Sequence, residues 1–209
     1  MSFYSKNCPI PGVILAGGIS SRMGGGDKSL LRLGEKSILD HVIFRLAPQV
    51  NSIALNANGD TQRFSDYNLP VISDSIEGFA GPLAGVLSGL DWAAENGFDK
   101  IITVAADTPF FPRLLVDDLS KECLKAKALI GLAVTQSFDG SKLIRHPTFG
   151  LWSVSLKEDL RTALNSGLRK VVLWSEKHEA VDVLFESSVL DPFFNVNTQE
   201  DLELAKKMI

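Results

Sequence analysis

The chain has 209 residues, of which 45% are hydrophobic and 22% charged, and its formal net charge is −4. This size and composition fit one α/β domain that buries its core without disulfides, and the negative charge argues against a general nucleic-acid binder. The only cysteines, Cys8 and Cys123, have no metal-ligand spacing, and no stretch approaches the roughly 20 apolar residues of a membrane span. We expect a cytoplasmic protein that has neither a membrane nor a nucleic acid as partner.

Short apolar, β-rich segments alternate with helical patterns over the first two thirds of the chain. The predicted strands cover residues 12–16, 52–56, 69–73, 100–105 and 128–134. The predicted helices cover residues 37–47, 82–95 and 112–125, with Pro112 at the first helical position, and a weaker helical pattern covers 60–66. This alternation predicts a mostly parallel sheet covered by helices on both faces.

The pattern changes after residue 135. Residues 136–145 are polar and predict a loop or hairpin, followed by strands at 147–152, 180–185 and 193–196 and helices at 155–166, 169–177 and 198–208. We interpret residues 1–209 as a single domain, in which about 10–135 form one half of a cleft and 136–209 the other. Ligands of open α/β sheets bind outside the carboxyl ends of the strands, so the candidate residues are those that follow each strand.

The first predicted strand leads into a segment with five glycines and two cations, GGISSRMGGGDK from Gly17 to Lys28. Glycines let backbone N–H groups approach phosphate oxygens without a Cβ clash. Arg22 can bind phosphate bidentately, and Lys28 adds a point charge. The segment therefore predicts a loop that holds a nucleoside triphosphate.

Two common phosphate loops are excluded. The dinucleotide pattern G-x-G-x-x-G is absent, because Gly17-Gly18 is followed by Ile-Ser. The P-loop requires a glycine directly before its lysine, and Asp27 occupies that position. The loop is therefore a phosphate loop of another kind.

In its glycine-rich segment the sequence resembles the molybdenum cofactor guanylyltransferases (molybdopterin-guanine dinucleotide synthases, MobA-like), a family of the nucleotidyltransferase superfamily. Residues 15–28, with Leu-Ala-Gly-Gly, Arg-Met-Gly and Asp-Lys, look like that family's signature. Further blocks follow in the family's order over nearly the whole chain: Asn56-Ala-Asn, Asp74-Ser, Gly81-Pro-Leu-Ala-Gly, Asp107-Thr-Pro, His146-Pro and Asn195-Val-Asn-Thr.

The resemblance implies a fold and a reaction. The fold would be a three-layer α/β/α sandwich with a mostly parallel sheet, of the nucleotide-diphospho-sugar-transferase type. The reaction would transfer GMP from GTP to molybdenum-molybdopterin, form the guanine dinucleotide cofactor and release pyrophosphate, with Mg²⁺ as cofactor. Other molybdenum cofactor biosynthesis proteins would be candidate partners.

Three polar residues follow predicted strands. Asp107 is placed to hold Mg²⁺ on phosphate oxygens, or else to cap the next helix. Asp74 could bind metal or ribose, or make an Asx turn, and Asn56 could contact a base edge or ribose, or make a turn. The resemblance makes Asp107 the metal ligand and a catalytic residue with Arg22 and Lys28. It implies that the nucleotide contacts Leu15, Ala16, Gly17, Gly18, Lys28, Asn56, Asp74, Gly81, Gly85 and Asp107.

The block from Gly81 to Gly85 opens a helix, and a helix N-terminus suits a phosphate or nucleotide. Gly85 and Gly89 lie on one helix face, which indicates close packing against the nucleotide or the sheet.

The acceptor half is predicted from three residues. His146 follows Lys142 and Arg145 in a basic loop that either receives the pterin phosphate or is a solvated charge cluster. The resemblance places Asn195 and Asn197 near the second substrate or the metal, but Asn197 also fits a helix N-cap with Glu200. Trp152 and Trp174 are interpreted as core residues rather than as platforms for a pterin.

Three other functions are compatible with parts of the pattern. A molybdopterin cytidylyltransferase tends to carry Ala-Ala-Gly where this chain has Ala16-Gly17-Gly18. Many sugar-phosphate nucleotidyltransferases are longer and lack the Asp-Lys pair together with His146-Pro147. A non-catalytic nucleotide-binding module would not require an aspartate for a metal. These differences favour the guanylyltransferase.

Overall fold

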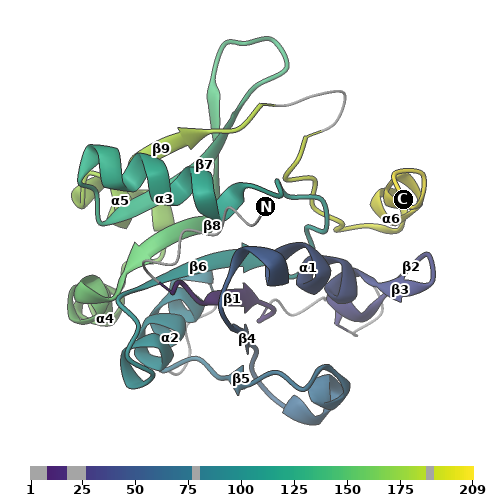
Figure 1. Cartoon of the computed structure of the whole chain (residues 1–209), viewed down its shortest axis with the longest axis horizontal. Helices are drawn as coiled ribbons and strands as arrows, with labels where there is room; N and C mark the ends of the chain where they lie inside the picture. Colours follow the sequence, from purple (N-terminus) through teal and green to yellow (C-terminus); the bar gives the residue numbers. More distant parts are fainter. Residues whose placement is uncertain (1–8, 18–26, 77–80, 187–190) are drawn as a thin grey trace, which may run out of the picture.

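The computed structural model describes residues 9–17, 27–76, 81–186 and 191–209. In these residues a central sheet has the order β5-β4-β1-β6-β8-β7-β9 (Figure 1). The strands are β1 (Gly12–Leu15), β4 (Ile53–Asn56), β5 (Val71–Ile72), β6 (Lys100–Ala105), β7 (Ile130–Gln136), β8 (Leu143–Ser153) and β9 (Val181–Leu184). Only β8 runs antiparallel to its neighbours in this sheet, so the prediction of a mostly parallel sheet is confirmed.

Strand β1 is the point at which the chain changes direction across the sheet. It pairs with β4 on one side and β6 on the other, and Leu15 is in register with both Asn56 and Ala105. The residues that follow these three strands therefore emerge at one edge of the sheet. Such a switch point is where open α/β sheets bind ligands.

Helices cover both faces of the sheet. Helices α1 (Ile38–Leu46) and α3 (Leu115–Ala126) bury Leu39, Leu46 and Leu119 in one core cluster. On the other face, α2 (Pro82–Glu95), α4 (Lys157–Asn165) and α5 (Val171–Lys177) form a second cluster. Trp152 and Trp174 lie fully buried in it with ring centroids 6.1 Å apart. The three-layer sandwich and the core role of both tryptophans are confirmed.

The C-terminal helix α6 (Gln199–Lys206) lies on the small hairpin formed by β2 (Arg32–Leu33) and β3 (Lys36–Ser37), as Figure 1 shows. Leu33 and Ile38 from the N-terminal half pack with Val196, Leu202 and Ala205 in a third cluster of buried residues. This packing brings the segment before α6 back to the carboxyl edge of the sheet.

The remaining elements are short 3₁₀ helices and the hairpin formed by β7 and β8. Four short 3₁₀ helices cover Lys28–Leu30, Ala47–Gln49, Thr61–Tyr67 and Val154–Leu156 in the described part of the chain. Residues 136–145 form the turn and adjoining strands of the β7–β8 hairpin. The pairing of β8 with β7 shifts so that residues 147–149 have no opposite residue. Pro147, which has no N–H to donate, lies in this irregular stretch.

Two local predictions are wrong. Pro112 is not the first residue of α3, which starts at Leu115: the Gln49 amide donates to the Pro112 carbonyl at 3.3 Å and accepts from the Val116 N–H at 3.2 Å. Residues 193–196 do not form a strand, because the Val196 N–H donates to the backbone carbonyl of Asp107 at 2.9 Å.

Within the described residues, no helix combines the length and apolar character needed to span a bilayer.

Candidate functional site

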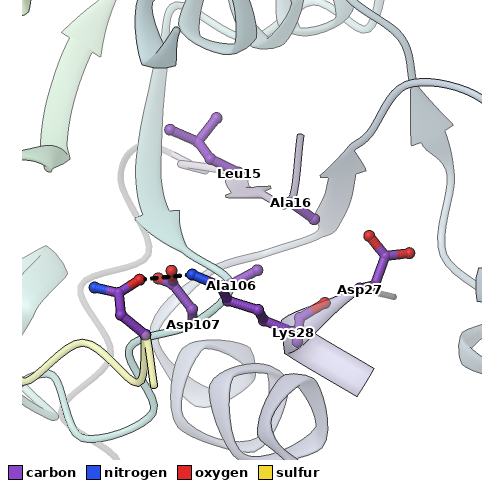
Figure 2. A pocket seen from close by; sticks show the side chains of 8 residues that line it. Leu15, Ala16, Asp27, Lys28, Ala106 and Asp107 are labelled. Carbon is purple, nitrogen blue, oxygen red and sulfur yellow. Dashed lines mark hydrogen bonds between the residues drawn. The ribbon is translucent and has the colours of Figure 1, made fainter. Parts of the chain in front are cut away.

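A cleft of about 250 Å³ lies at the carboxyl ends of β1 and β6. Figure 2 shows that the segments after these strands form one wall and that Lys28 reaches in from its 3₁₀ helix. The lining residues are Leu15, Ala16, Asp27, Lys28, Ser29, Ala106, Asp107 and Asn197. Residues from the first loop, the sheet and the C-terminal segment therefore meet at the switch point.

Lys28 connects the two halves of the chain. Its Nζ donates to Asn197 Oδ1 at 2.9 Å, the interaction drawn as a dashed line in Figure 2. The alternative role of Asn197 as an N-cap is excluded, since Thr198 caps α6 in a capping box with Asp201. Because the cap lies one residue later, the Asn197 side chain is directed to Lys28 instead.

Asp107 follows β6 and lies partly buried at the base of the cleft. Burial raises the pKa of its carboxyl above the ordinary value, while the Lys28 ammonium, the Thr108 hydroxyl and the Asn195 side chain oppose this shift. The Thr108 Oγ1 donates to Asp107 Oδ1 at 3.3 Å. The alternative role as a helix cap is excluded, because Leu114 holds the N-cap position of α3.

The donor set around Asp107 fits a hard divalent cation completed by substrate oxygens. No group of three or more His, Cys, Asp or Glu able to hold a metal occurs in the described ranges. Mg²⁺ needs no such cage, since it is commonly bound by one or two carboxylates together with substrate phosphates and water. Asp107 supplies a carboxylate. The Asn195 side chain hydrogen-bonds to this carboxylate, and the Asn197 amide oxygen accepts from Lys28.

A second polar network lies at the ends of β4 and β5. Asn56 is only 3% exposed, and its Nδ2 donates to the Ile72 carbonyl at 3.2 Å and to Asp74 Oδ1 at 2.9 Å. Asn58 Nδ2 donates to Asp74 Oδ2 at 2.8 Å, and Asn58 Oδ1 accepts from the Asp74 N–H at 2.9 Å. Asp74 is thus a fixed acceptor for two amides, which is more than the turn role alone requires.

The two acceptors facing Asn56 Nδ2 fix the orientation of this amide, because neither can donate a hydrogen bond. Asn56 Oδ1 consequently points toward Gly17 and Gly85. A Cβ on Gly85 would lie 2.3 Å from this oxygen, and one on Gly17 3.7 Å from it. Asn58 was not among the predicted site residues, although its position two residues after Asn56 on an extended segment was a readable signal.

Helix α2 begins after Gly81, its N-cap, with Pro82 at the first position. Gly85 and Gly89 are closely packed, as expected, but each lies against different residues. Gly89 lies against Val13 and Ile101 of the sheet, whereas Gly85 lies against Asn56 and Leu15 at the site.

Gly85→Ala should weaken nucleotide binding by displacing the Asn56 side chain, with a rise in Kd for GTP of about tenfold. Isothermal titration with GTP measures this. Gly89→Ala is the matched control, because its new Cβ would meet only the sheet residues Val13 and Ile101. It should lower the melting temperature and leave GTP affinity unchanged. Equal GTP affinity in Gly85→Ala and the native protein would contradict the expectation that Asn56 contacts the nucleotide.

The prediction of a basic loop at Arg145 and His146 is wrong. His146 and Arg145 lie in β8, and Arg145 is engaged by Asp182 at 2.9 Å and Glu176 at 2.6 Å. His146 Nε2 lies 2.8 Å from Thr135 Oγ1, and its ring stacks on Phe193 with centroids 4.3 Å apart. Burial lowers the pKa of His146, against the charge of Asp191. His146 is not one of the described residues that line the cleft.

Arg22 and Gly18 lie outside the described residues. Among the described site residues, the structure brings together Leu15, Ala16, Lys28, Asp107 and Asn197 in the cleft. It also brings Gly17, Asn56 and Gly85 together, and links Asn56 to Asp74.

Comparison with known proteins gives consistent similarities. The MobA-like NTP transferase domain model matches residues 12–181. The chain is 45% identical to the molybdenum cofactor guanylyltransferase of Bradyrhizobium sp. (strain ORS 278), covering 98% of this chain and 95% of the relative. It is 46% identical to the protein of the same name from Mesorhizobium japonicum, covering 96% of each chain.

Solved structures support the fold. Molybdopterin-guanine dinucleotide biosynthesis protein A of Archaeoglobus fulgidus is similar with a TM-score of 0.72 and 22% identity, over 95% of this chain and 98% of that one. The 4-diphosphocytidyl-2C-methyl-D-erythritol synthase of Anaerococcus prevotii is similar with a TM-score of 0.73 and 14% identity, over 96% and 98%. Both likenesses agree with a sandwich of the nucleotide-diphospho-sugar-transferase type.

Proposed function

Because the chain belongs to the MobA-like NTP transferase family, we propose that it transfers GMP from GTP to molybdenum-molybdopterin, forming the guanine dinucleotide cofactor and releasing pyrophosphate. The observation that carries this proposal is the Lys28–Asn197 contact beside Asp107, which joins the N-terminal loop to the C-terminal segment at the switch point of the sheet. Residues from about 10 to 135 would hold the nucleotide, and residues 136–209 the acceptor.

In the proposed reaction, an oxygen of the acceptor's terminal phosphate attacks the α-phosphorus of GTP. The bond between the α-phosphorus and the bridging oxygen to the β-phosphate breaks, and pyrophosphate leaves with the electron pair. No covalent enzyme intermediate is required, since the acceptor phosphate is already ionised. Catalysis then depends on positioning and on neutralising the phosphate charges.

The chain's own residues divide these tasks. The Lys28 ammonium stabilises charge on the leaving pyrophosphate, and we assign the same task to Arg22 of the glycine-rich loop. Asp107 would hold Mg²⁺, which when bound supplies positive charge to the substrate phosphate oxygens. Asn195 and Asn197 would position the acceptor. His146 would support the acceptor half through its contacts with Phe193 and Thr135 and not as a cation, because its lowered pKa disfavours a positive charge.

Guanine is the base that the relatives support best, and the site offers a group that can bind it. The fixed Asn56 amide presents an acceptor oxygen toward Gly17 and Gly85, and Leu15, Ala16 and Gly17 supply backbone beside it. Guanine offers N–H donors on the edge that such an oxygen contacts. Gly81 and Asp74 would complete the nucleotide pocket from α2 and β5.

The raised pKa of Asp107 leads to a pH-dependent prediction. Only the ionised Asp107 carboxylate can hold the proposed metal. The value of kcat/KM should therefore fall as the pH drops through this pKa. Asn195→Ala removes a contact that lowers the pKa, so the pKa rises and the acidic limb moves to higher pH. The exposed Asn165→Ala in α4 is the control and should leave the limb in place. An unmoved limb in Asn195→Ala would show that Asp107 does not set this profile.

The function itself is tested by pyrophosphate release with molybdopterin as acceptor and GTP, CTP, ATP or UTP in parallel. Release with GTP is the expected result. Preference for CTP would instead identify a cytidylyltransferase, and no release with any nucleotide would favour a binding module.

A further inference from the structure

Asp27 is a carboxylate in a cleft that is proposed to receive a triphosphate. It lines the cleft directly beside Lys28, and its side chain is 17% exposed. An ionised carboxylate there would repel the phosphates. The site therefore requires a group that neutralises Asp27.

Arg63 is that group. It comes from the 3₁₀ helix Thr61–Tyr67, and its Nε donates to the Asp27 carboxylate. Its two other nitrogens donate to backbone carbonyls, one to Asp60 and one to Asn58, the latter at 2.9 Å. The guanidinium also lies 4.6 Å from the centre of the Phe64 ring, which fixes its plane.

These contacts hold two walls of the site together. The backbone carbonyl of Asp27 accepts from the Leu30 N–H at 3.0 Å, so Asp27 fixes the start of the 3₁₀ helix that carries Lys28. Asn58, whose backbone carbonyl accepts from Arg63, also binds Asp74 just after β5 through its side chain. Arg63 therefore ties the segment proposed to hold phosphate to the network proposed to hold the nucleoside.

We propose that Arg63 is a positioning residue for the nucleotide: it neutralises Asp27, whose charge would otherwise repel the phosphates of a nucleoside triphosphate, and it ties Asp27 to the segment that carries Asn58. This inference rests on the proposed function of the cleft. Arg63 acts through Asp27 rather than on the substrate, because each of its three nitrogens is directed to an oxygen of the protein.

A charge-rescue experiment tests this role. GTP binding is measured by isothermal titration without acceptor for Arg63→Met, Asp27→Asn and the double variant. Arg63→Met should raise the Kd for GTP about tenfold, because Asp27 is left uncompensated. In the double variant the carboxylate charge is gone as well, so affinity should return to within about threefold of Asp27→Asn. Added salt should shrink the Arg63→Met defect.

Arg113→Met is the matched control, since Arg113 also lies over a phenyl ring, that of Phe44 at 6.0 Å, and is exposed. It should leave the Kd unchanged. Equal defects in Arg63→Met and the double variant, or native affinity in Arg63→Met, would overturn the proposal. If Arg63→Met does not fold, Arg63→Lys decides: it keeps the charge and should bind GTP within about threefold of the native protein, and a larger defect overturns the inference.

This experiment is independent of the transfer reaction. A native protein that binds GTP but releases no pyrophosphate in the presence of molybdopterin would contradict the proposed function, while the four Kd values would still decide the role of Arg63.

Discussion

Asp107→Asn should lower kcat for guanylyl transfer by about 10²- to 10³-fold and, in the same protein, raise the melting temperature without nucleotide. The catalytic loss follows because the amide cannot supply the negative oxygen that the proposed metal requires. The gain in stability follows because burial raises the pKa of this carboxyl, so its ionised form is disfavoured in the folded chain.

The difference in stability between the native protein and Asp107→Asn should depend on pH. Below the unfolded-state pKa the carboxyl is protonated in both states, and the native and variant chains should differ least. As the pH rises through the higher folded-state pKa, the native protein loses stability relative to Asp107→Asn, and the difference then levels off. Thermal unfolding across this pH range measures the effect.

Asp99→Asn is the matched control, since Asp99 is exposed directly before β6, whereas Asp107 lies after the same strand. It should change neither turnover nor melting temperature. Retained turnover in Asp107→Asn would remove this residue from the catalytic site, and a lowered melting temperature would show that its burial does not destabilise the fold.

Lys28→Met should reduce kcat/KM for GTP by about 10²- to 10³-fold, because an apolar side chain replaces the ammonium that faces the departing phosphates. The loss should appear in kcat as well as KM, since charge builds on pyrophosphate in the transition state. Steady-state kinetics with varied GTP measure both constants.

Lys121→Met, an exposed lysine of α3, controls for the loss of one positive charge and should behave as the native protein. Asn197→Ala removes the hydrogen-bond partner of Lys28 but keeps the charge, so its defect should be smaller than that of Lys28→Met. Turnover of Lys28→Met within about threefold of the native value would exclude Lys28 from charge stabilisation.

The elements with the strongest local signals were predicted well. The predicted bounds of β6 agree with the structure, because an apolar run is limited there by polar residues, and so do those of α2, because Gly81-Pro82 marks a helix start. Asp107 was found from its place after a strand, since the carboxyl ends of parallel strands share one edge.

Features that depend on distant residues were not predicted. Arg63 meets Asp27 across 36 positions of sequence, and Arg145 meets Asp182 across 37, so no local pattern indicates either pair. The cap of α6 is a local feature that the sequence does contain, because Thr198 and Asp201 form a capping box within four residues.

We infer above all that the cleft at the carboxyl ends of β1 and β6 transfers a nucleotidyl group. The most direct measurement follows the label from GTP radiolabelled at the α-phosphate or at the γ-phosphate, with molybdopterin as acceptor. We expect the α-label to enter the pterin product and the γ-label to leave as pyrophosphate. Transfer of the γ-label to the acceptor, or its release as inorganic phosphate with the α-label remaining in GDP, would contradict it.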